Sequence, residues 1–217
     1  MAQPYQLSEV KASVESAELS GLIWLGAARA QELLALGLRE EAKEQWQHTL
    51  NQADLSGQMA LGMLALQRGW PDFGVDAAIA GGNWDRLDLR FPYAFWKEFQ
   101  TAAKDTEQDP FVLIALARRE SSLNPLARSK VGARGLMQLM PATARSVAKE
   151  NGVSYRGMTT LYDPQVNIAW GTSYYAGLVE RYDGNRVKAL AAYNAGPSRV
   201  SRWLSDSQSV DQWVDSL

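Results

Sequence analysis

The chain has 217 residues, 46% of them hydrophobic, and its 22 basic and 24 acidic side chains give a net charge of −2. This composition supports a globular core and excludes a disordered chain, and so small a net charge does not indicate nucleic-acid binding. Because there is no Cys and a single His, His48, the sequence excludes disulfides and thiolate zinc sites and argues against a His-based metal centre or a Ser-His-Asp triad.

The sequence also lacks membrane and export signals. No stretch approaches the eighteen or so consecutive apolar residues of a transmembrane helix. The N-terminal residues, Met-Ala-Gln-Pro-Tyr, lack the basic segment and apolar run of a secretory signal. We therefore expect no transmembrane segment and no signal peptide in this chain.

Apolar residues recur at helical spacing through residues 1–90. The first predicted helix has its apolar stripe at Leu19, Leu22, Ile23, Ala27, Ala30, Leu33 and Leu34. The predicted helices are 13–36, 39–50, 55–68 and one from Pro71 to the Gly81-Gly82 pair. Short helices joined by Gly-containing turns are typical of stacked antiparallel pairs, so we predict an α-superhelical region here.

A change of composition near residues 83–92 predicts a boundary, with a second helical domain over residues 91–217. Two Asp-Pro pairs, at 109–110 and 163–164, combine an N-cap residue with proline at the first helical position. The predicted helices are 92–103, one from Pro110, one from Pro141, one from Pro164 to about Tyr182, 185–193 and 197–204, with an irregular segment at 122–136. No strand pattern is convincing, so the predicted fold class is all-α.

The most informative single residue is Glu120, near the end of the helix that begins at Pro110. Leu113, Leu116 and Ala117 share its helix face, so the carboxyl group lies at the end of an apolar stripe. Burial and the negative end of the helix dipole both disfavour the carboxylate, which predicts a raised pKa, as a general acid requires. The alternative is a carboxylate that is exposed or paired with a nearby arginine.

Two further segments are candidates for a binding site. The run 132–141 contains two glycines, which permit close backbone approach, and Gln138, whose amide can bind a hydroxyl or amide group. The alternative is a Gly-rich turn whose methionines pack in the core. Tyr193 and Asn194 lie where another helix is predicted to stop, which allows them to face a cleft, although each alone is also compatible with a structural role.

Together, the motifs Glu-Ser-Ser-Leu-Asn-Pro (120–125), Gly-Leu-Met-Gln-Leu-Met-Pro (135–141) and Ala-Ala-Tyr-Asn-Ala-Gly-Pro (191–197) resemble those of the Slt-type soluble lytic murein transglycosylases, in order and in spacing. The resemblance is strong over residues 92–204 and weaker over 27–91, where it suggests the superhelical linker of that family. It implies a lysozyme-like (goose-type) helical domain preceded by a short α-superhelical segment.

The resemblance also implies an activity, namely cleavage of peptidoglycan between N-acetylmuramic acid and N-acetylglucosamine with closure of a 1,6-anhydro ring. By residue matching, Glu120 is the catalytic acid and base. Ser129, Gln138 and Met140 line the saccharide groove, and Tyr193 and Asn194 lie beside the acid. The resemblance implies neither metal nor cofactor.

The distribution of acidic residues agrees with this chemistry. A hydrolase with two carboxylates needs a second one within ~5–10 Å of the first. Residues 121–149 and 185–205 contain no Asp or Glu, although Glu150, Asp163 and Asp183 could fold into reach. An intramolecular hydroxyl needs no such partner and benefits from proximity, so the missing carboxylate favours transfer over hydrolysis.

The predicted function is therefore a peptidoglycan lytic transglycosylase. The alternatives are a lysozyme-like hydrolase on the same fold and a non-catalytic peptidoglycan-binding module. The expected partners are glycan strands of peptidoglycan and other cell-wall proteins, without nucleic acid. The periplasm is the expected location, because the substrate lies outside the inner membrane.

Overall fold

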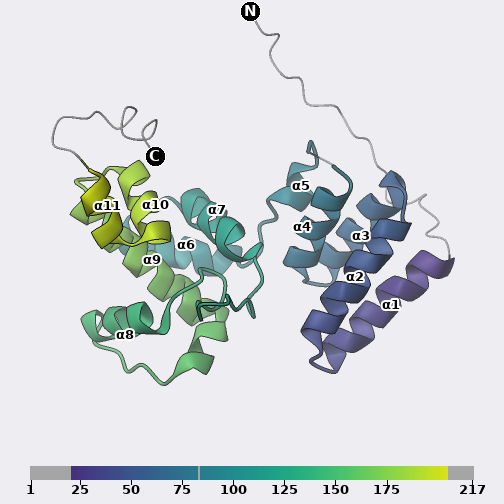
Figure 1. The fold of residues 1–217 in the computed structure, drawn as a ribbon, viewed down its shortest axis with the longest axis horizontal. Helices are drawn as coiled ribbons and strands as arrows, with labels where there is room; N and C mark the ends of the chain where they lie inside the picture. Colours follow the sequence, from purple (N-terminus) through teal and green to yellow (C-terminus); the bar gives the residue numbers. More distant parts are fainter. Residues whose placement is uncertain (1–20, 83, 205–217) are drawn as a thin grey trace, which may run out of the picture. The chain divides into compact units, whose positions relative to one another are not determined.

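The computed structural model describes residues 21–82 and 84–204, which form helices joined by turns and loops (Figure 1). Among these residues there is no β-strand, only two isolated bridges that both involve Arg134. The predicted all-α class is therefore confirmed. The chain divides into two compact units: the first runs to Ala94 and includes Ser122–Asn124, and the second comprises Phe95–Ser121 and the residues from Pro125. The boundary expected after residue 90 stays a prediction.

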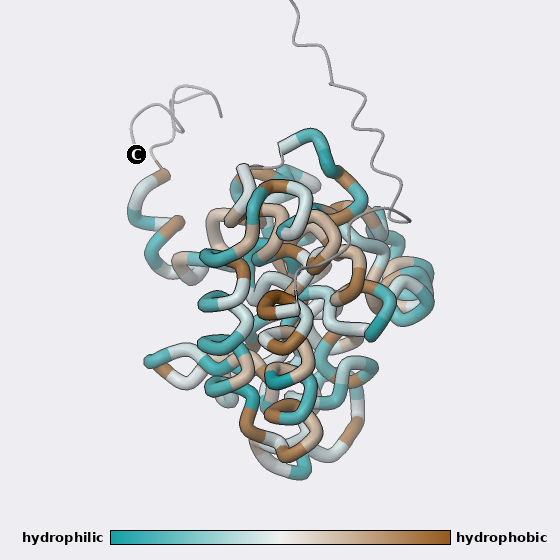
Figure 2. Tube along the Cα trace, turned by 90° about the vertical axis from the view of Figure 1, so that its right-hand side faces the viewer, coloured by the Kyte–Doolittle hydropathy of each residue, from teal (hydrophilic) through white to brown (hydrophobic). Residues whose placement is uncertain are grey.

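The first unit consists of helical pairs. Its helices are α1 (Gly21–Ala35), α2 (Arg39–Gln52), α3 (Leu55–Gln67), α4 (Pro71–Ala80) and the short α5 (Leu87–Arg90). Helix α1 packs on α2, α3 packs on α4, and α2 also contacts α4. Hydrophobic and hydrophilic residues follow one another along the helical tube in Figure 2.

The core of this unit is centred on Trp46, which is 1% exposed. Its indole Nε1 donates to the Phe73 carbonyl oxygen at 3.0 Å, and the two rings meet edge to face at 5.4 Å. In α1, Ile23 lies in this core as predicted, but the prediction for Leu22 is wrong because its side chain is 76% exposed. Leu22 is one position, roughly 100°, around the helix from Ile23, away from the buried face. Leu19 lies outside the described residues.

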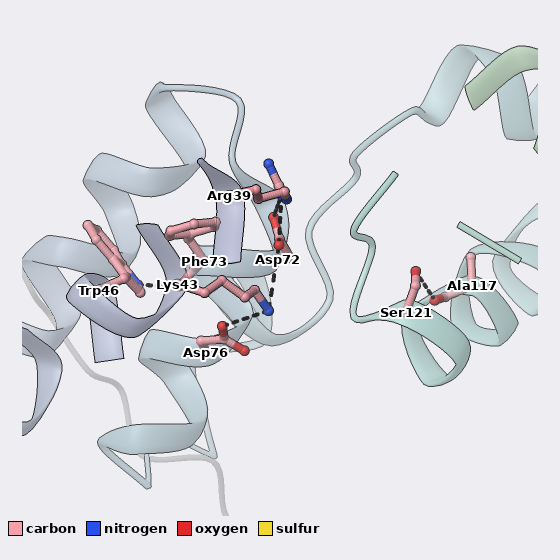
Figure 3. A network of polar contacts seen from close by, with 8 residues as sticks. All are labelled: Arg39, Lys43, Trp46, Asp72, Phe73, Asp76, Ala117 and Ser121. Carbon is pink, nitrogen blue, oxygen red and sulfur yellow. Dashed lines mark hydrogen bonds and ion pairs between the residues drawn. The ribbon is translucent and has the colours of Figure 1, made fainter. Parts of the chain in front are cut away.

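A buried carboxylate ties α4 to α2 (Figure 3). Asp72 is fully buried and accepts two hydrogen bonds of 2.8 Å from Arg39. Lys43 approaches Asp72 at 3.7 Å and Asp76 at 3.2 Å. Burial raises the pKa of Asp72, and the charges of Arg39 and Lys43 oppose this shift, so the cost of burying the carboxylate offsets part of what its ion pairs contribute to stability.

The second unit is arranged around one long helix, α9. Its helices are α6 (Trp96–Thr106), α7 (Pro110–Ser121), α8 (Pro141–Glu150), the 3-10 helix η2 (Met158–Tyr162), α9 (Pro164–Arg181), α10 (Arg186–Ala195) and α11 (Pro197–Trp203). Helix α9 contacts α6, α8, α10 and η2. Asp109 and Asp163 accept backbone N–H groups of the following turns, which confirms both predicted helix starts. These caps fix the start of α7, and hence where Glu120 lies along it.

Some predicted helix limits are wrong. Helix α6 begins at Trp96 instead of 92, because Phe95 takes a left-handed conformation (φ 54°) that interrupts the helix before it. The first predicted helix is described from Gly21 onward, and residues 13–20 lie outside the described part. The short α5 and η2 were not predicted, since segments of four and five residues are too short to show a helical period.

Candidate active site

Glu120 lies in the last turn of α7, above a buried apolar face. Leu113 and Ala117 are fully buried and Leu116 is 9% exposed, as the helical spacing predicts. The hydroxyl of the next residue, Ser121, lies 2.8 Å from the carbonyl oxygen of Leu136, to which it donates, and 3.1 Å from that of Ala117. Figure 3 shows the contact with Ala117. The end of the helix is thus tied to the loop that follows it, which fixes the position of the carboxyl group.

The half-buried carboxyl group opens into a cavity of about 590 Å³. The residues that line it are Val112, Ala115, Leu116, Arg119, Glu120, Leu190 and Asn194. A cavity of this size falls in the range of ligand sites, and here most of its wall is aliphatic. The structure therefore brings Asn194 of α10 together with Glu120, as the third motif suggested.

Burial raises the pKa of Glu120, and the positive charge of Arg119 opposes this shift more weakly. The direction agrees with the prediction from the helix face. Among the described residues no ion pair involves Glu120, so the alternative of a paired carboxylate is wrong. A carboxyl group in this setting keeps its proton to higher pH than an exposed one.

The other acidic candidates do not share this cavity. Glu150 lines a separate cavity of about 370 Å³ between α8 and α9. Asp163 caps α9, and Asp183 is exposed in the turn after α9. Of the described residues that line the first cavity, only Glu120 is acidic.

Tyr193, one residue before Asn194, anchors α10 to the loop at 132–140. Its hydroxyl donates to the Met137 carbonyl oxygen at 2.8 Å, and its ring packs 5.3 Å from that of Tyr174. Burial, and next the charge of Glu120, hold the pKa of Tyr193 well above its usual range, so this phenol stays protonated near the carboxyl group. Its side chain is partly buried and does not line the cavity.

The segment at 132–140 is a compact folded loop. The isolated bridge Arg134↔Leu139 closes the loop, and Arg128↔Arg134 joins it to the residues before it. Gly135 has a φ of +73°, and a Cβ there would collide with the Leu161 carbonyl oxygen and the Asn167 amide. Glycine is therefore required here, as the close backbone approach inferred from the sequence predicts.

Asn167 of α9 was not singled out by the sequence reasoning, yet it holds this loop. Its Oδ1 accepts the Met137 N–H at 2.7 Å, and its Nδ2 donates to the carbonyl oxygens of Arg134 (3.0 Å) and Leu161 (2.8 Å). The side chain is fully buried. The amide of Asn167 between the apolar Val166 and Ile168, early in the helix, was the available signal.

Gln138 and Met140 lie in this loop and Ser129 lies just before it, but none of the three lines the cavity of Glu120. Ser129 Oγ accepts the Ala133 N–H at 2.9 Å. Gln138 has a φ of 47°, and its Nε2 donates to the carbonyl oxygens of Ala127 and Gly135, which leaves Oε1 as its acceptor. Met140 is 40% exposed, whereas Met137 is buried. The alternative interpretation, in which the methionines of this segment pack in the core, is therefore correct for Met137.

Comparison with solved structures defines the class of fold. The structure superimposes with a TM-score of 0.81 on the 70 kDa soluble lytic transglycosylase of Escherichia coli, at 36% identity over 92% of this chain and 32% of that one. An inactive mutant of the lytic transglycosylase Slt of Pseudomonas aeruginosa, with a glutamate changed to glutamine, gives 0.81 at 35% identity over 88% of this chain and 31% of that one. The protein is thus an all-α, lysozyme-like domain preceded by a short α-superhelical segment.

Sequence comparison gives the family. Residues 97–216 match the transglycosylase SLT domain, and residues 24–87 match the soluble lytic murein transglycosylase L domain. The chain therefore belongs to the SLT-domain lytic transglycosylase family. The soluble lytic murein transglycosylase of Salmonella typhimurium is 42% identical over 83% of this chain and 28% of its own length. The chain thus spans about three tenths of the length of such relatives.

In the described ranges no helix is long and apolar enough to cross a membrane. The same residues contain no group of three or more His, Cys, Asp or Glu side chains that could hold a metal ion.

Proposed function

We propose that this protein is a peptidoglycan lytic transglycosylase. It cleaves the β-1,4 bond between N-acetylmuramic acid and N-acetylglucosamine and forms a 1,6-anhydromuramyl end. One observation carries the proposal: of the described residues that line the cavity, only Glu120 is acidic, and burial raises the pKa of its carboxyl group. Membership of the SLT-domain family supports the same substrate class.

In this reaction Glu120 makes both proton transfers. Its carboxylic acid protonates the glycosidic oxygen while the bond from that oxygen to C1 of the muramyl residue breaks. The 6-hydroxyl of the same muramyl residue then attacks C1, and its proton passes to the Glu120 carboxylate. The acid is restored, no water is consumed, and the intramolecular attack benefits from proximity.

The lack of a second carboxylate among the described residues that line the cavity supports this route. A hydrolase with a second carboxylate would place it within ~5–10 Å, as nucleophile or as a base toward water. In the cavity the other polar residues are Arg119 and Asn194, and neither can serve as that carboxylate. An internal hydroxyl nucleophile removes the need for one.

The loop residues take binding roles in this proposal. Gln138 Oε1 accepts a hydrogen bond from a sugar hydroxyl or N-acetyl amide, Ser129 offers its hydroxyl, and Met140 offers an exposed apolar contact. Asn194 binds the saccharide next to Glu120, and Tyr193 holds the loop against α10. The reaction uses neither a metal nor a cofactor, and its peptidoglycan substrate gives the protein a role in cell-wall turnover in the periplasm, beside other wall proteins.

Product analysis tests the reaction. Purified sacculi are digested with the protein, and the soluble fragments are analysed by mass spectrometry. We expect anhydromuropeptides, which are lighter by one water than hydrolytic products. Reducing muramyl ends would instead identify a lysozyme-like hydrolase, and binding without soluble fragments would identify a binding module.

The pH profile tests the acid role of Glu120. Because the acid form is required first, activity falls as pH rises through the raised pKa of Glu120. Arg119→Gln removes the charge that lowers this pKa, so in this variant the fall in activity on the alkaline side of the pH profile moves to higher pH. Arg156→Gln removes an equal charge from an exposed loop outside the cavity, so activity should fall at the same pH as in the wild type. An activity that keeps rising well above neutral pH would contradict the role.

A further inference from the structure

Two aromatic rings of the first unit form an exposed surface that is separate from the cavity of Glu120. Trp84 lies in the turn before α5, and Phe91 directly follows that helix (Figure 1). The two residues are 54% and 49% exposed. We call Trp84, Phe91 and Arg90, which contacts both rings, the aromatic platform.

Arg90 holds the platform in place. The central carbon of its guanidinium lies 5.1 Å from the centre of each ring. Its Nη1 also donates to the Trp84 carbonyl oxygen at 2.6 Å, and the Trp84 N–H donates to the Gly82 carbonyl oxygen at 2.8 Å. A ring that is held in this way has little freedom left to lose, so a ligand that packs on it orders few additional groups.

Trp84 differs in this respect from the other tryptophans of the unit. Trp46 and Trp70 pack against Phe73 in the core. Trp24 in α1 is exposed to a similar degree as Trp84, but among the described residues it makes no ring or cation contact. A single exposed tryptophan is unremarkable, whereas one that is exposed and also held by a cation resembles a preformed binding surface.

The charges around the platform balance. The charged residues between the two rings are Asp85, Arg86, Asp88 and Arg90, which sum to zero. Arg86 forms an ion pair with Asp88 through two hydrogen bonds of 2.6 and 2.9 Å. Such a surface has no net attraction for an acidic polymer or an anionic membrane, and it suits an uncharged ligand with an apolar face.

A sugar ring has this combination of properties. Its face presents C–H groups, which can pack on an aromatic ring, and its edge presents hydroxyl groups, which need hydrogen-bond partners. The indole Nε1 of Trp84 makes no hydrogen bond among the described residues, so it can donate to a sugar oxygen. The half-exposed carboxylate of Asp88 can accept from a sugar hydroxyl.

We propose that the aromatic platform is a second glycan-binding site, at which a saccharide unit of a peptidoglycan strand packs on the rings of Trp84 and Phe91. The identity of the glycan rests on the proposed function. The platform residues do not line the cavity of Glu120, so the site binds the wall without taking part in bond cleavage. It attaches the first unit to the same polymer on which the second unit acts.

Nuclear magnetic resonance tests this contact directly. The protein carries Glu120→Gln, so that the ligand stays intact, and the ligand is glycan strands stripped of their peptides by an amidase. We expect the indole N–H signal of Trp84, assigned by its loss in Trp84→Phe, to shift as strands are added, while that of Trp24 stays in place. Strands that bind without moving the Trp84 signal overturn the platform.

Binding to sacculi tests its contribution to affinity. A sacculus presents many strands, so both sites can be occupied at once and loss of one lowers the overall affinity. In the Glu120→Gln protein we expect Trp84→Ala to lower the affinity for sacculi about five-fold and Trp84→Phe, which keeps a ring, to lower it less than about two-fold. Trp24→Ala is the matched control and keeps the affinity.

Equal affinities of Trp84→Ala and Trp24→Ala overturn the platform. A Trp84 signal that shifts with protein concentration in the absence of strands, and not with added strands, also overturns it, because the surface would then bind a second copy of this chain. Absence of cleavage by the wild-type chain would overturn the proposed function instead, and the Trp84 signal would still decide whether the platform binds glycan.

Discussion

Replacing Glu120 by glutamine is expected to lower the rate of sacculus solubilisation roughly 10³-fold. Glutamine has nearly the same shape but no transferable proton, so it can neither protonate the glycosidic oxygen nor accept the proton of the 6-hydroxyl. Clearing of a sacculus suspension measures the loss, and co-sedimentation with sacculi shows whether binding is retained.

Asp183→Asn is the matched control for this substitution. It also changes a carboxylate of the second unit to an amide, but in an exposed turn outside the cavity. Asn tolerates the positive φ of 52° at this position, so the turn should keep its shape. Activity of Glu120→Gln within ten-fold of the wild type would remove Glu120 from the proposed mechanism.

Replacing Asn167 by alanine is expected to destabilise the second unit by about 3–5 kcal/mol. The substitution leaves the Met137 N–H and the carbonyl oxygens of Arg134 and Leu161 without their buried partner, and it opens a void. For a unit of this size, that corresponds to a fall in Tm on the order of 10 °C. Activity falls as well, because Met137 also accepts the hydrogen bond of Tyr193.

Hydrogen exchange locates this effect. The Met137 amide, which donates to Asn167, should lose protection first in the variant. Asn151→Ala is the control, since among the described residues the exposed Asn151 side chain bonds only Ser173, at 3.3 and 3.4 Å. Equal melting temperatures for the two variants would mean that the loop at 132–140 does not depend on Asn167.

The sequence predicted most helices of the second unit because their signals are local. Asp109-Pro110 and Asp163-Pro164 start α7 and α9 as expected, since an N-cap and a proline act on the next turn only. The helix face below Glu120 was also predictable, because three residues at helical spacing are enough to define it. The start of α6 was not predictable, because no sequence pattern marks Phe95 as a residue with a left-handed backbone conformation.

The sequence by itself determined the helical class, the position of Glu120 on an apolar face, and the absence of acidic residues from 121–149 and 185–205. Only the tertiary structure decided that Asn194 shares the cavity of Glu120, that Arg119 belongs to the same wall, and that Asn167 holds the loop at 132–140. The physical reason is separation along the chain. Caps and helix faces depend on residues within a turn or two, whereas the bond of Tyr193 to Met137 spans 56 positions and forms only once the helices have packed.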